Sequence, residues 1–379
     1  MTAMLDLKPI YGSYSPDDCQ FLLTPIETEF LSIEEKERRI QTGTAHYSEM
    51  IHREPAPSDT YLDMFETLCE RYAHRMAGEV RLLARELVAE YGPSERPLTL
   101  VSLVRAGTPA GALLRRAITE YEGQPCHHYS ISIIRDRGID AAALDYLLDT
   151  AGVDPQRLIF VDAWTAKGVI TRELRHDMAR YNTARKAKGK SLIATRLAVI
   201  SDIGGTADYA ATCEDYAIPS GVLNATVSGL VSRSVLNEQI PEGAFHGCVV
   251  YDELAEQDHS QAFIERIAAQ FPAVDLDALP GLQESSRHRQ QALMKEMLTQ
   301  IQQDYAIEDI NHVKPGVAEA TRVMLRRVPA LLIVCDANHA DVAHLLRLAE
   351  EKSVPVVEDS RMPFHACSLI KVMAQQEVV

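Results

Sequence analysis

One segment, residues 158–171, has the residue types that can hold a phosphate group. Its apolar run, Leu158–Val161, ends at the carboxylate of Asp162, and a turn with Thr165 and Gly168 precedes a helical pattern. The first N–H groups of a helix have no partner within the helix and carry partial positive charge, so they attract anions. Thr165 adds a hydroxyl donor, and Gly168 lacks the Cβ that would obstruct close approach. The segment predicts phosphate binding, and a plain loop before a capped helix is the alternative.

Three other turns follow apolar runs in the same way. One holds Arg105, a second holds Arg135 and Arg137, and a third holds Asp202 before two glycines. An arginine can clamp two phosphate oxygens at once, which is the strong geometry for that anion. The turn at Asp202 competes with the turn at Asp162 for the same role. For each arginine alone, a solvated surface position is the alternative.

The order of these turns resembles the type I phosphoribosyltransferases. This resemblance implies an enzyme that uses phosphoribosyl pyrophosphate (PRPP) and Mg²⁺. It assigns catalysis to Asp162, Arg135 and Arg137, with Asp162 also contacting the metal. It assigns PRPP binding to Arg105, Ala106, Gly107, Thr165, Ala166, Lys167 and Gly168. Ala163 replaces the second acid of the family's loop, so a protein that binds PRPP or a nucleotide without catalysis is an alternative.

Two further segments, 41–51 and 218–233, resemble a narrower family. This is the phosphoribosyltransferase-like (StiP-type) family of bacterial tellurite-resistance and stress gene clusters. The resemblance implies a stress-response role in the cytoplasm and a pocket for an acceptor that the sequence does not identify. The pocket residues are Asp202, His46, Glu49, Ser228 and Arg233. Helix capping and loop hydrogen bonds are the alternative roles of these side chains.

Chains of this type are also labelled cysteine proteases, which gives a third hypothesis. A cysteine nucleophile needs a nearby base and an oxyanion site. Cys213 precedes Glu214 and Asp215, and acids beside a thiol raise its pKa instead of activating it. Val222 stands where relatives can carry a cysteine. The protease therefore remains an alternative.

The C-terminal segment resembles the Pelota family of RNA-binding domains. The resemblance rests on Val313–Arg322, on the apolar run Leu331–Val334 and on the segment 352–357. It implies RNA contacts from Lys314, Gly316, Glu319 and Arg322, while Ala318 replaces an asparagine that would contact bases. A small α/β domain that docks on another protein is the alternative.

The elements that must position these residues follow from the alternation of short apolar runs with helical patterns. Strands are expected at 98–104, 128–134, 158–162, 197–202 and 247–251, separated by helices, which predicts a largely parallel sheet. Ligands of such sheets collect at the carboxyl ends of the strands. The predicted organisation is an N-terminal helical extension (1–95), a phosphoribosyltransferase-like domain (96–275), a linker helix (276–310) and a Pelota-like α/β domain (311–379).

Bulk composition limits the partners. The net charge of -16 repels nucleic-acid backbones, so RNA must meet a local cationic patch. No apolar stretch has a membrane-spanning length, and no membrane partner is expected. The seven cysteines are scattered without a CxxC pair, which fits a reducing compartment. No GxxxxGK[ST] motif occurs, so an ordinary ATPase is not predicted. A homo-oligomer is compatible with the sequence.

Overall fold

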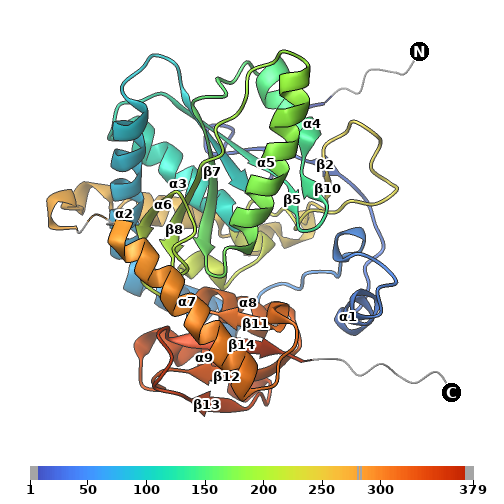
Figure 1. The fold of residues 1–379 in the computed structure, drawn as a ribbon, viewed down its shortest axis with the longest axis vertical. Coiled ribbons are helices and arrows are strands. Elements are labelled where there is room, and N and C mark those ends of the chain that lie inside the picture. The colour runs from blue at the N-terminus through green and yellow to red at the C-terminus, as the bar shows by residue number, and fades with distance from the viewer. Residues whose placement is uncertain (1–6, 280, 282–283, 372–379) are drawn as a thin grey trace.

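A computed structural model describes residues 7–279, 281 and 284–371 of the chain. The larger body is built on a six-stranded sheet in which all neighbouring strands are parallel. Figure 1 shows this sheet inside the larger body with helices packed around it. The strands in spatial order are β1 (Gln20–Leu22), β4 (Cys126–Ile131), β3 (Leu98–Leu103), β7 (Leu158–Thr165), β8 (Leu197–Asp202) and β9 (Tyr209–Thr212). The predicted α/β class with a parallel sheet is confirmed.

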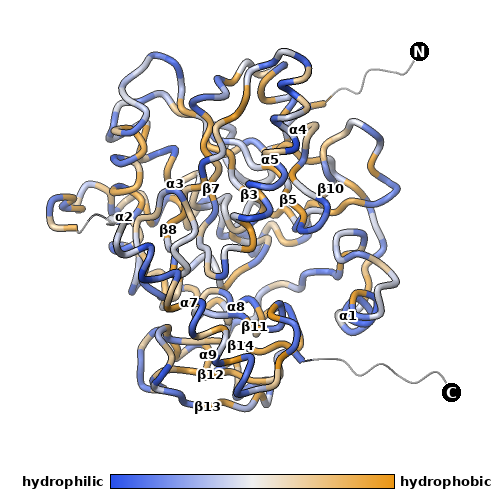
Figure 2. The backbone as a smooth tube through the Cα atoms, viewed as in Figure 1, coloured by the Kyte–Doolittle hydropathy of each residue, from blue (hydrophilic) through white to orange (hydrophobic). Residues whose placement is uncertain are grey.

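Helices cover both faces of this sheet because successive strand residues alternate between two cores. Leu100 and Ile159 face one core, whereas Val101 and Phe160 face the other. The first face is covered by α2 (Asp59–Tyr91), α3 (Gly107–Glu120) and α6 (Ser260–Ala268), and the second by α4 (Ala141–Asp145) and α5 (Val169–Ala187). Figure 2 shows the hydrophobic segments concentrated along the central strands.

The C-terminal domain is a small mixed sheet with two helices. Its strand order is β11 (Val313–Pro315), β14 (Ala366–Ile370), β12 (Pro329–Val334) and β13 (Val356–Glu358), with only β12 and β13 parallel. Its helices are α8 (Val317–Arg326) and α9 (Ala343–Glu351), and α7 (Glu284–Asp304) leads into it. Buried residues of α8 and α9 join the same apolar cluster as α2 and α3, so the domain is packed onto the larger body.

Three expectations about strands are wrong. The region 1–95 holds α1 (Ile33–Gln41) and α2 but also β1 in the main sheet, because Phe21 and Leu22 are fully buried beside β4. The strand that starts at Leu158 continues to Thr165, since β8 pairs with it up to that residue. The segment expected as a fifth strand at 247–251 instead forms β10 (Gly247–Cys248), which pairs with β2 (Thr24–Pro25) outside the main sheet.

One short hairpin and several single-turn helices complete the described elements. β5 (Ile133–Ile134) and β6 (Gly138–Ile139) form a hairpin that holds the turn with Arg135 and Arg137. Single-turn helices connect several of the other elements. Among the described residues, no helix combines the length and the apolar composition that crossing a membrane requires.

Candidate functional site

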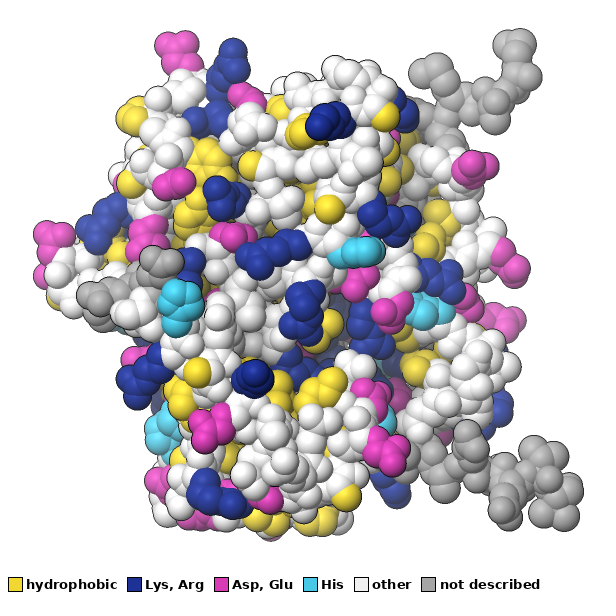
Figure 3. Space-filling view, viewed as in Figure 1, with side chains coloured by type: hydrophobic (Ala, Val, Ile, Leu, Met, Phe, Trp, Pro, Cys, Tyr) yellow, Lys and Arg dark blue, Asp and Glu magenta, His cyan; other side chains and the backbone are white. Residues whose placement is uncertain are grey.

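A large cavity lies where the larger body, the α1 region and the C-terminal domain meet. Its volume is 1820 Å³, and Figure 3 shows a hollow at this position with Lys and Arg side chains in and around it. The larger body contributes the turn after β3, with Arg105 and Ala106, the hairpin residue Arg135, and Trp164 at the end of β7. Two of the predicted turns therefore border the same space.

The lining of this cavity is strongly cationic although the chain is acidic. Its basic side chains are Lys36, Arg38, Arg105, Arg135, Arg233, Lys314, Arg322, Arg326, Arg327 and Lys371. Its acidic side chains are Glu34, Glu35, Glu37, Glu54 and Asp309. A chain of net charge -16 that concentrates cations in one cavity creates a local positive field there. The arrangement suits a ligand with several negative charges.

A buried ion pair fixes Arg105 at the back of the cavity. Its guanidinium lies 2.6 Å from the Glu54 carboxylate, and both side chains are less than a tenth exposed. It also donates to Asn224 Oδ1 at 3.2 Å and to the Val231 carbonyl at 3.3 Å. Burial would raise the pKa of Glu54, but the charge of Arg105 outweighs it and the pKa lies below its ordinary value. Arg105 is therefore held rigidly at the start of α3.

The C-terminal domain supplies the opposite wall through α8. Arg322 pairs with Glu319 at 2.9 Å, and Arg327 pairs with the buried Glu37 at 2.8 Å. Arg326 forms no ion pair among the described residues; one of its guanidinium nitrogens donates to the Leu223 carbonyl at 3.4 Å. Burial, with the charges of Arg105 and Arg322, lowers the pKa of Arg326 well below its ordinary value. An anion in the cavity would relieve this repulsion.

The predicted PRPP loop after β7 faces the C-terminal domain more than the cavity. Lys167 donates to the Ile310 and Val313 carbonyls, each at 2.7 Å, and burial together with Lys314 lowers its pKa to about 8. Gly168 has the positive φ of 67° that begins α5. The predicted loop residues Thr165, Ala166, Lys167 and Gly168 are not in the cavity lining, whereas Trp164 is.

Asp162 and Asp202 differ in how their carboxylates are used. Asp162 is partly enclosed, and burial raises its pKa to about 7 although it accepts a hydrogen bond from the Ala163 N–H at 2.8 Å. It lies directly behind the turn after β3, where a Cβ on Gly107 would come within 3.1 Å of its Cα. Asp202 is fully buried and accepts from the N–H groups of Gly204 and Ala207 within its own loop.

The residues predicted for the acceptor pocket are divided between two places. Arg233 and Ser228 line the cavity, and Arg233 donates to the Tyr47 carbonyl at 2.7 Å. His46 caps the single turn 47–49 and Glu49 pairs with Arg137, so these side chains lie outside the cavity lining. Asp202 is also outside it.

The predicted RNA-contacting segment is turned toward the larger body. Lys314 and Arg322 line the cavity, but Gly316 packs so closely that a Cβ would lie 2.5 Å from Ile203 Cδ1. Glu319 accepts a hydrogen bond from Trp164 Nε1 at 3.1 Å. Burial opposes ionisation of Glu319, but Arg322 and Lys314 lower its pKa to about 2. The α8 face and the turn after β3 therefore share one cavity.

Sequence reasoning missed three residues of this site. Glu54 holds Arg105, and Lys36 contacts His52 Nδ1 at 2.9 Å at another part of the wall. Burial and Arg233 lower the pKa of Lys36 to about 8, and burial and Lys36 lower that of His52 to about 4. All three precede α2 in a segment without a motif. The sequence offered one signal: a buried arginine such as Arg105 needs an acidic partner. It does not show which acidic residue that partner is.

None of the seven cysteines is placed as a nucleophile. Six thiols are buried, and Cys335 is half-buried. Burial raises the pKa of Cys213 to about 11 and the pKa of Cys69, Cys126, Cys248 and Cys367 to about 12. Within the described residues, no cysteine sulfur is hydrogen-bonded to a histidine ring. Val222, at the position where relatives can carry a cysteine, is buried and apolar.

Fold and cavity together define an α/β protein whose C-terminal domain closes a cationic cavity. A family model described as "Tellurite-like stress resistance cysteine protease StiP" matches residues 12–268, and one described as "PELOTA RNA binding domain" matches residues 292–372. A relative from Acinetobacter baylyi, named cysteine protease StiP, is 40% identical over 373 residues, which are 95% of this chain and 94% of the relative. The chain belongs to the StiP family, as the sequence resemblance predicted.

Solved phosphoribosyltransferases match part of the chain with low scores. The hypoxanthine phosphoribosyltransferase of Trypanosoma cruzi is 19% identical, with a TM-score of 0.28, over 37% of this chain and 77% of that chain. The HGPRT-ase from Leishmania tarentolae in complex with GMP is 16% identical, with a TM-score of 0.28, over the same shares of the two chains. Scores this low carry no information about activity. The names of the family model and of the Acinetobacter relative favour the protease hypothesis over the transferase hypothesis.

Proposed function

We propose that this StiP-family protein binds a phosphorylated ribose of the PRPP type in the cavity and transfers its phosphoribosyl group to an acceptor. One observation carries the proposal. A chain of net charge -16 directs ten lysine and arginine side chains into a single cavity, one of them the unpaired Arg326. A peptide substrate would not require this charge, whereas a diphosphate would.

In this function the residues bind and orient the substrates, and they exclude water from the cavity. Arg105 and the backbone N–H groups at the start of α3 hold the diphosphate, and Arg135 closes over it from the hairpin. The bond between the ribose C1 atom and the diphosphate oxygen breaks with its electron pair leaving on the diphosphate. A lone pair of the acceptor then forms the new bond to C1. Asp162 lies behind this turn and outside the cavity lining, so it would orient the ribose hydroxyls only if the ribose reaches past the turn.

The residues near the turn after β3 offer few oxygen ligands for Mg²⁺. Mg²⁺ prefers oxygen ligands and often keeps several waters beside substrate phosphates and one or two carboxylates. Asp162 is the one acid near the turn whose carboxylate is not consumed by an ion pair, since Glu54 is paired with Arg105. When bound, the ion neutralises charge on the departing diphosphate. Asp162, which burial favours in the protonated form, would hold it only after losing its proton.

The first test is calorimetric titration with PRPP, with and without Mg²⁺. Arg326→Met should lower the affinity at least tenfold, because it removes a lining cation that forms no ion pair with the described residues. The same change should raise the free energy of unfolding by about 1 kcal/mol or more, since it removes a buried unpaired charge. The matched control is Arg53→Ala, whose exposed pair with Glu253 lies outside the cavity. Equal affinity of Arg326→Met and the wild-type protein would reject the cavity as the binding site.

The C-terminal domain suggests RNA as the acceptor or as the scaffold of the acceptor. The matching family model is described as RNA-binding. Lys314 and Arg322 present their charges inside the cavity, so an RNA strand would meet the phosphate-binding turn there and not on an outer face. Arg322→Ala should weaken binding of a short single-stranded RNA more strongly than it weakens binding of PRPP. Anisotropy of a labelled oligonucleotide measures the first effect and calorimetry the second.

Cysteine proteolysis is the second candidate, and the names of the family model and of the relative favour it. The thiols argue against it because burial keeps them protonated, and a thiolate is the nucleophile. Casein hydrolysis and iodoacetamide labelling test the point directly. We expect no hydrolysis and slow labelling. Hydrolysis that a single Cys→Ala change abolishes would establish the protease and reject the transferase.

A further inference from the structure

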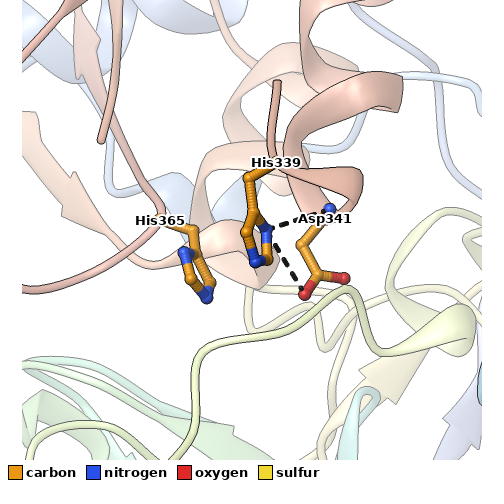
Figure 4. Close-up of side chains that lie close together, drawn as sticks. All are labelled: His339, Asp341 and His365. Carbon is orange, nitrogen blue, oxygen red and sulfur yellow. Dashed lines mark hydrogen bonds and ion pairs between the residues drawn. The ribbon is translucent and has the colours of Figure 1, made fainter. Parts of the chain in front are cut away.

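A second group of reactive side chains lies away from the cavity, where the C-terminal domain meets the larger body. His339, Asp341 and His365 each offer a ligand atom, and these atoms lie within 4.8 Å of one another. The two imidazole rings are stacked with centroids 3.8 Å apart and planes inclined by 16°. His339 Nδ1 lies 3.8 Å from Asp341 Oδ2. Figure 4 shows the rings side by side with the carboxylate next to them.

Backbone hydrogen bonds hold the segments that carry all three residues. His339 and Asp341 are separated by one residue at the single helical turn 340–342, where His339 Nδ1 accepts a hydrogen bond from the Asp341 N–H. His365 directly precedes β14 and donates its N–H to Asp215 Oδ2 at 2.9 Å. The group therefore combines two segments of the C-terminal sheet that are held to each other and to the larger body.

Asp341 is oriented by the larger body. Its Oδ1 atom accepts hydrogen bonds from the Tyr72 hydroxyl of α2 and, at 3.4 Å, from the Ala217 N–H. Its Oδ2 atom is thereby left facing His339. Outer contacts of this kind are what orient carboxylate ligands in metal sites.

We propose that His339, Asp341 and His365 bind one Zn²⁺-class divalent cation on the side of the C-terminal domain that packs against the larger body. Two imidazole nitrogens and one carboxylate oxygen are the ligand set of an open, four-coordinate zinc site, with water as the fourth ligand. Imidazole ligands favour Zn²⁺ over Mg²⁺ and Ca²⁺, which prefer oxygen. This proposal is independent of the proposed function.

Binding of a metal ion would require the three ligand atoms to move closer together. Zn–N and Zn–O bonds of about 2.0–2.2 Å in a tetrahedron place ligand atoms roughly 3.4 Å apart. The present spread of up to 4.8 Å must therefore shrink by about 1.4 Å. Both histidines are partly exposed, so their rings can turn, whereas the buried Asp341 is fixed by Tyr72. The carboxylate of Asp341 would thus keep its position, and the two imidazole rings would move toward it.

The experiment is titration of chelator-treated full-length protein with Zn²⁺ and Co²⁺. We expect one site per chain, and Co²⁺ absorption in the visible range without a thiolate charge-transfer band. His339→Ala and His365→Ala should each weaken binding at least about tenfold. His176→Ala, which removes an exposed histidine of α5, is the matched control and should bind like the wild type.

Thermal unfolding separates a metal site from a structural role of the same residues. Zn²⁺ should raise the melting temperature of the wild type and of His176→Ala, but not of His365→Ala. The melting temperatures without metal should agree, because the histidines are partly exposed. Asp341→Asn is the second variant and should abolish the Zn²⁺-dependent rise. Equal Zn²⁺ affinity in the wild type and both histidine variants, or thiolate ligation of Co²⁺, would overturn the proposal.

Discussion

Arg105 and Glu54 illustrate how this protein keeps a charge inside its cavity. The carboxylate also accepts the Ala225 N–H at 3.0 Å, so the pair is tied to the segment 223–228, which also lines the cavity. Such a pair is costly to bury but even more costly to break, because the remaining charge stays buried without a partner. The stability of this corner therefore depends on both members.

Removing one member gives a clear prediction. Arg105→Ala should lower the free energy of unfolding by about 3–5 kcal/mol, because Glu54 is left buried and unpaired. Arg53→Ala breaks the Arg53–Glu253 pair, whose side chains are largely exposed, and should cost at most about 1 kcal/mol. Urea denaturation of both variants measures the difference. Similar losses would show that the Arg105 pair is effectively solvated.

Asp162 predicts a pH dependence with a definite sign. Its pKa is about 7 in the folded protein and near 3.8 in an unfolded chain, so between these values the folded state binds more protons. The contribution of Asp162 to stability therefore falls as the pH rises from about 4 to 7 and is constant above that. Asp162→Asn should remove this trend, by at most about 4 kcal/mol across the window. Parallel stability profiles of the two proteins would contradict the raised pKa.

At the scale of elements, the apolar run 197–202 predicted β8 well, and the expected N-terminal helical extension contains the long helix α2. The strand β1 was missed because three residues carry no detectable alternation, and only their burial beside β4 makes them a strand. The end of β7 was misplaced because Ala163 and Trp164 fit a turn as well as a strand, and pairing with β8 decides between them. The local sequence pattern cannot show which segment, distant in sequence, a strand pairs with.

The site was predictable only in part for the same reason. Arg105 and Arg135 stand in turns with a recognisable order, and both line the cavity. The loop containing Lys167 had an equally good local pattern, yet its ammonium group is bonded to carbonyls of the C-terminal domain. Nothing in either segment encodes how the domains pack. The cavity itself arises from that packing.

Domain docking at α8 can be tested through one glycine. Gly316 has a φ of 88°, and an added Cβ would meet Ile203 at 2.5 Å. Gly316→Ala should therefore lose about 2–4 kcal/mol of stability from backbone strain and from overlap with the larger body. Gly189→Ala has a similar φ of 67° with nothing within 4 Å and should lose about 1–2 kcal/mol. Equal losses of stability for the two variants in thermal melts would mean that the domain boundary accommodates the added Cβ without further destabilisation.

For the whole molecule, the contrast between an acidic chain and a cationic cavity restricts which nucleic acids can bind. A single strand can place its phosphates inside the cavity, whereas a long duplex must bring most of its phosphates against the acidic exterior. We expect a short single-stranded RNA to bind more tightly than a duplex of the same sequence. Its affinity should fall with salt with a slope of about -0.7 per phosphate contacted. Tighter binding of the duplex in anisotropy titrations would contradict this arrangement.

The helix α2 has a consequence for motion between the two bodies. At 1.5 Å per residue its 33 residues form a rod about 50 Å long. Tyr72 contacts Asp341 of the C-terminal domain, while Arg81 and Arg85 further along donate to carbonyls of the larger body. No residue of α2 lines the cavity, so the helix connects the two bodies from outside it. A single straight helix that is anchored in both bodies resists hinge motion, and we therefore expect them to move as one.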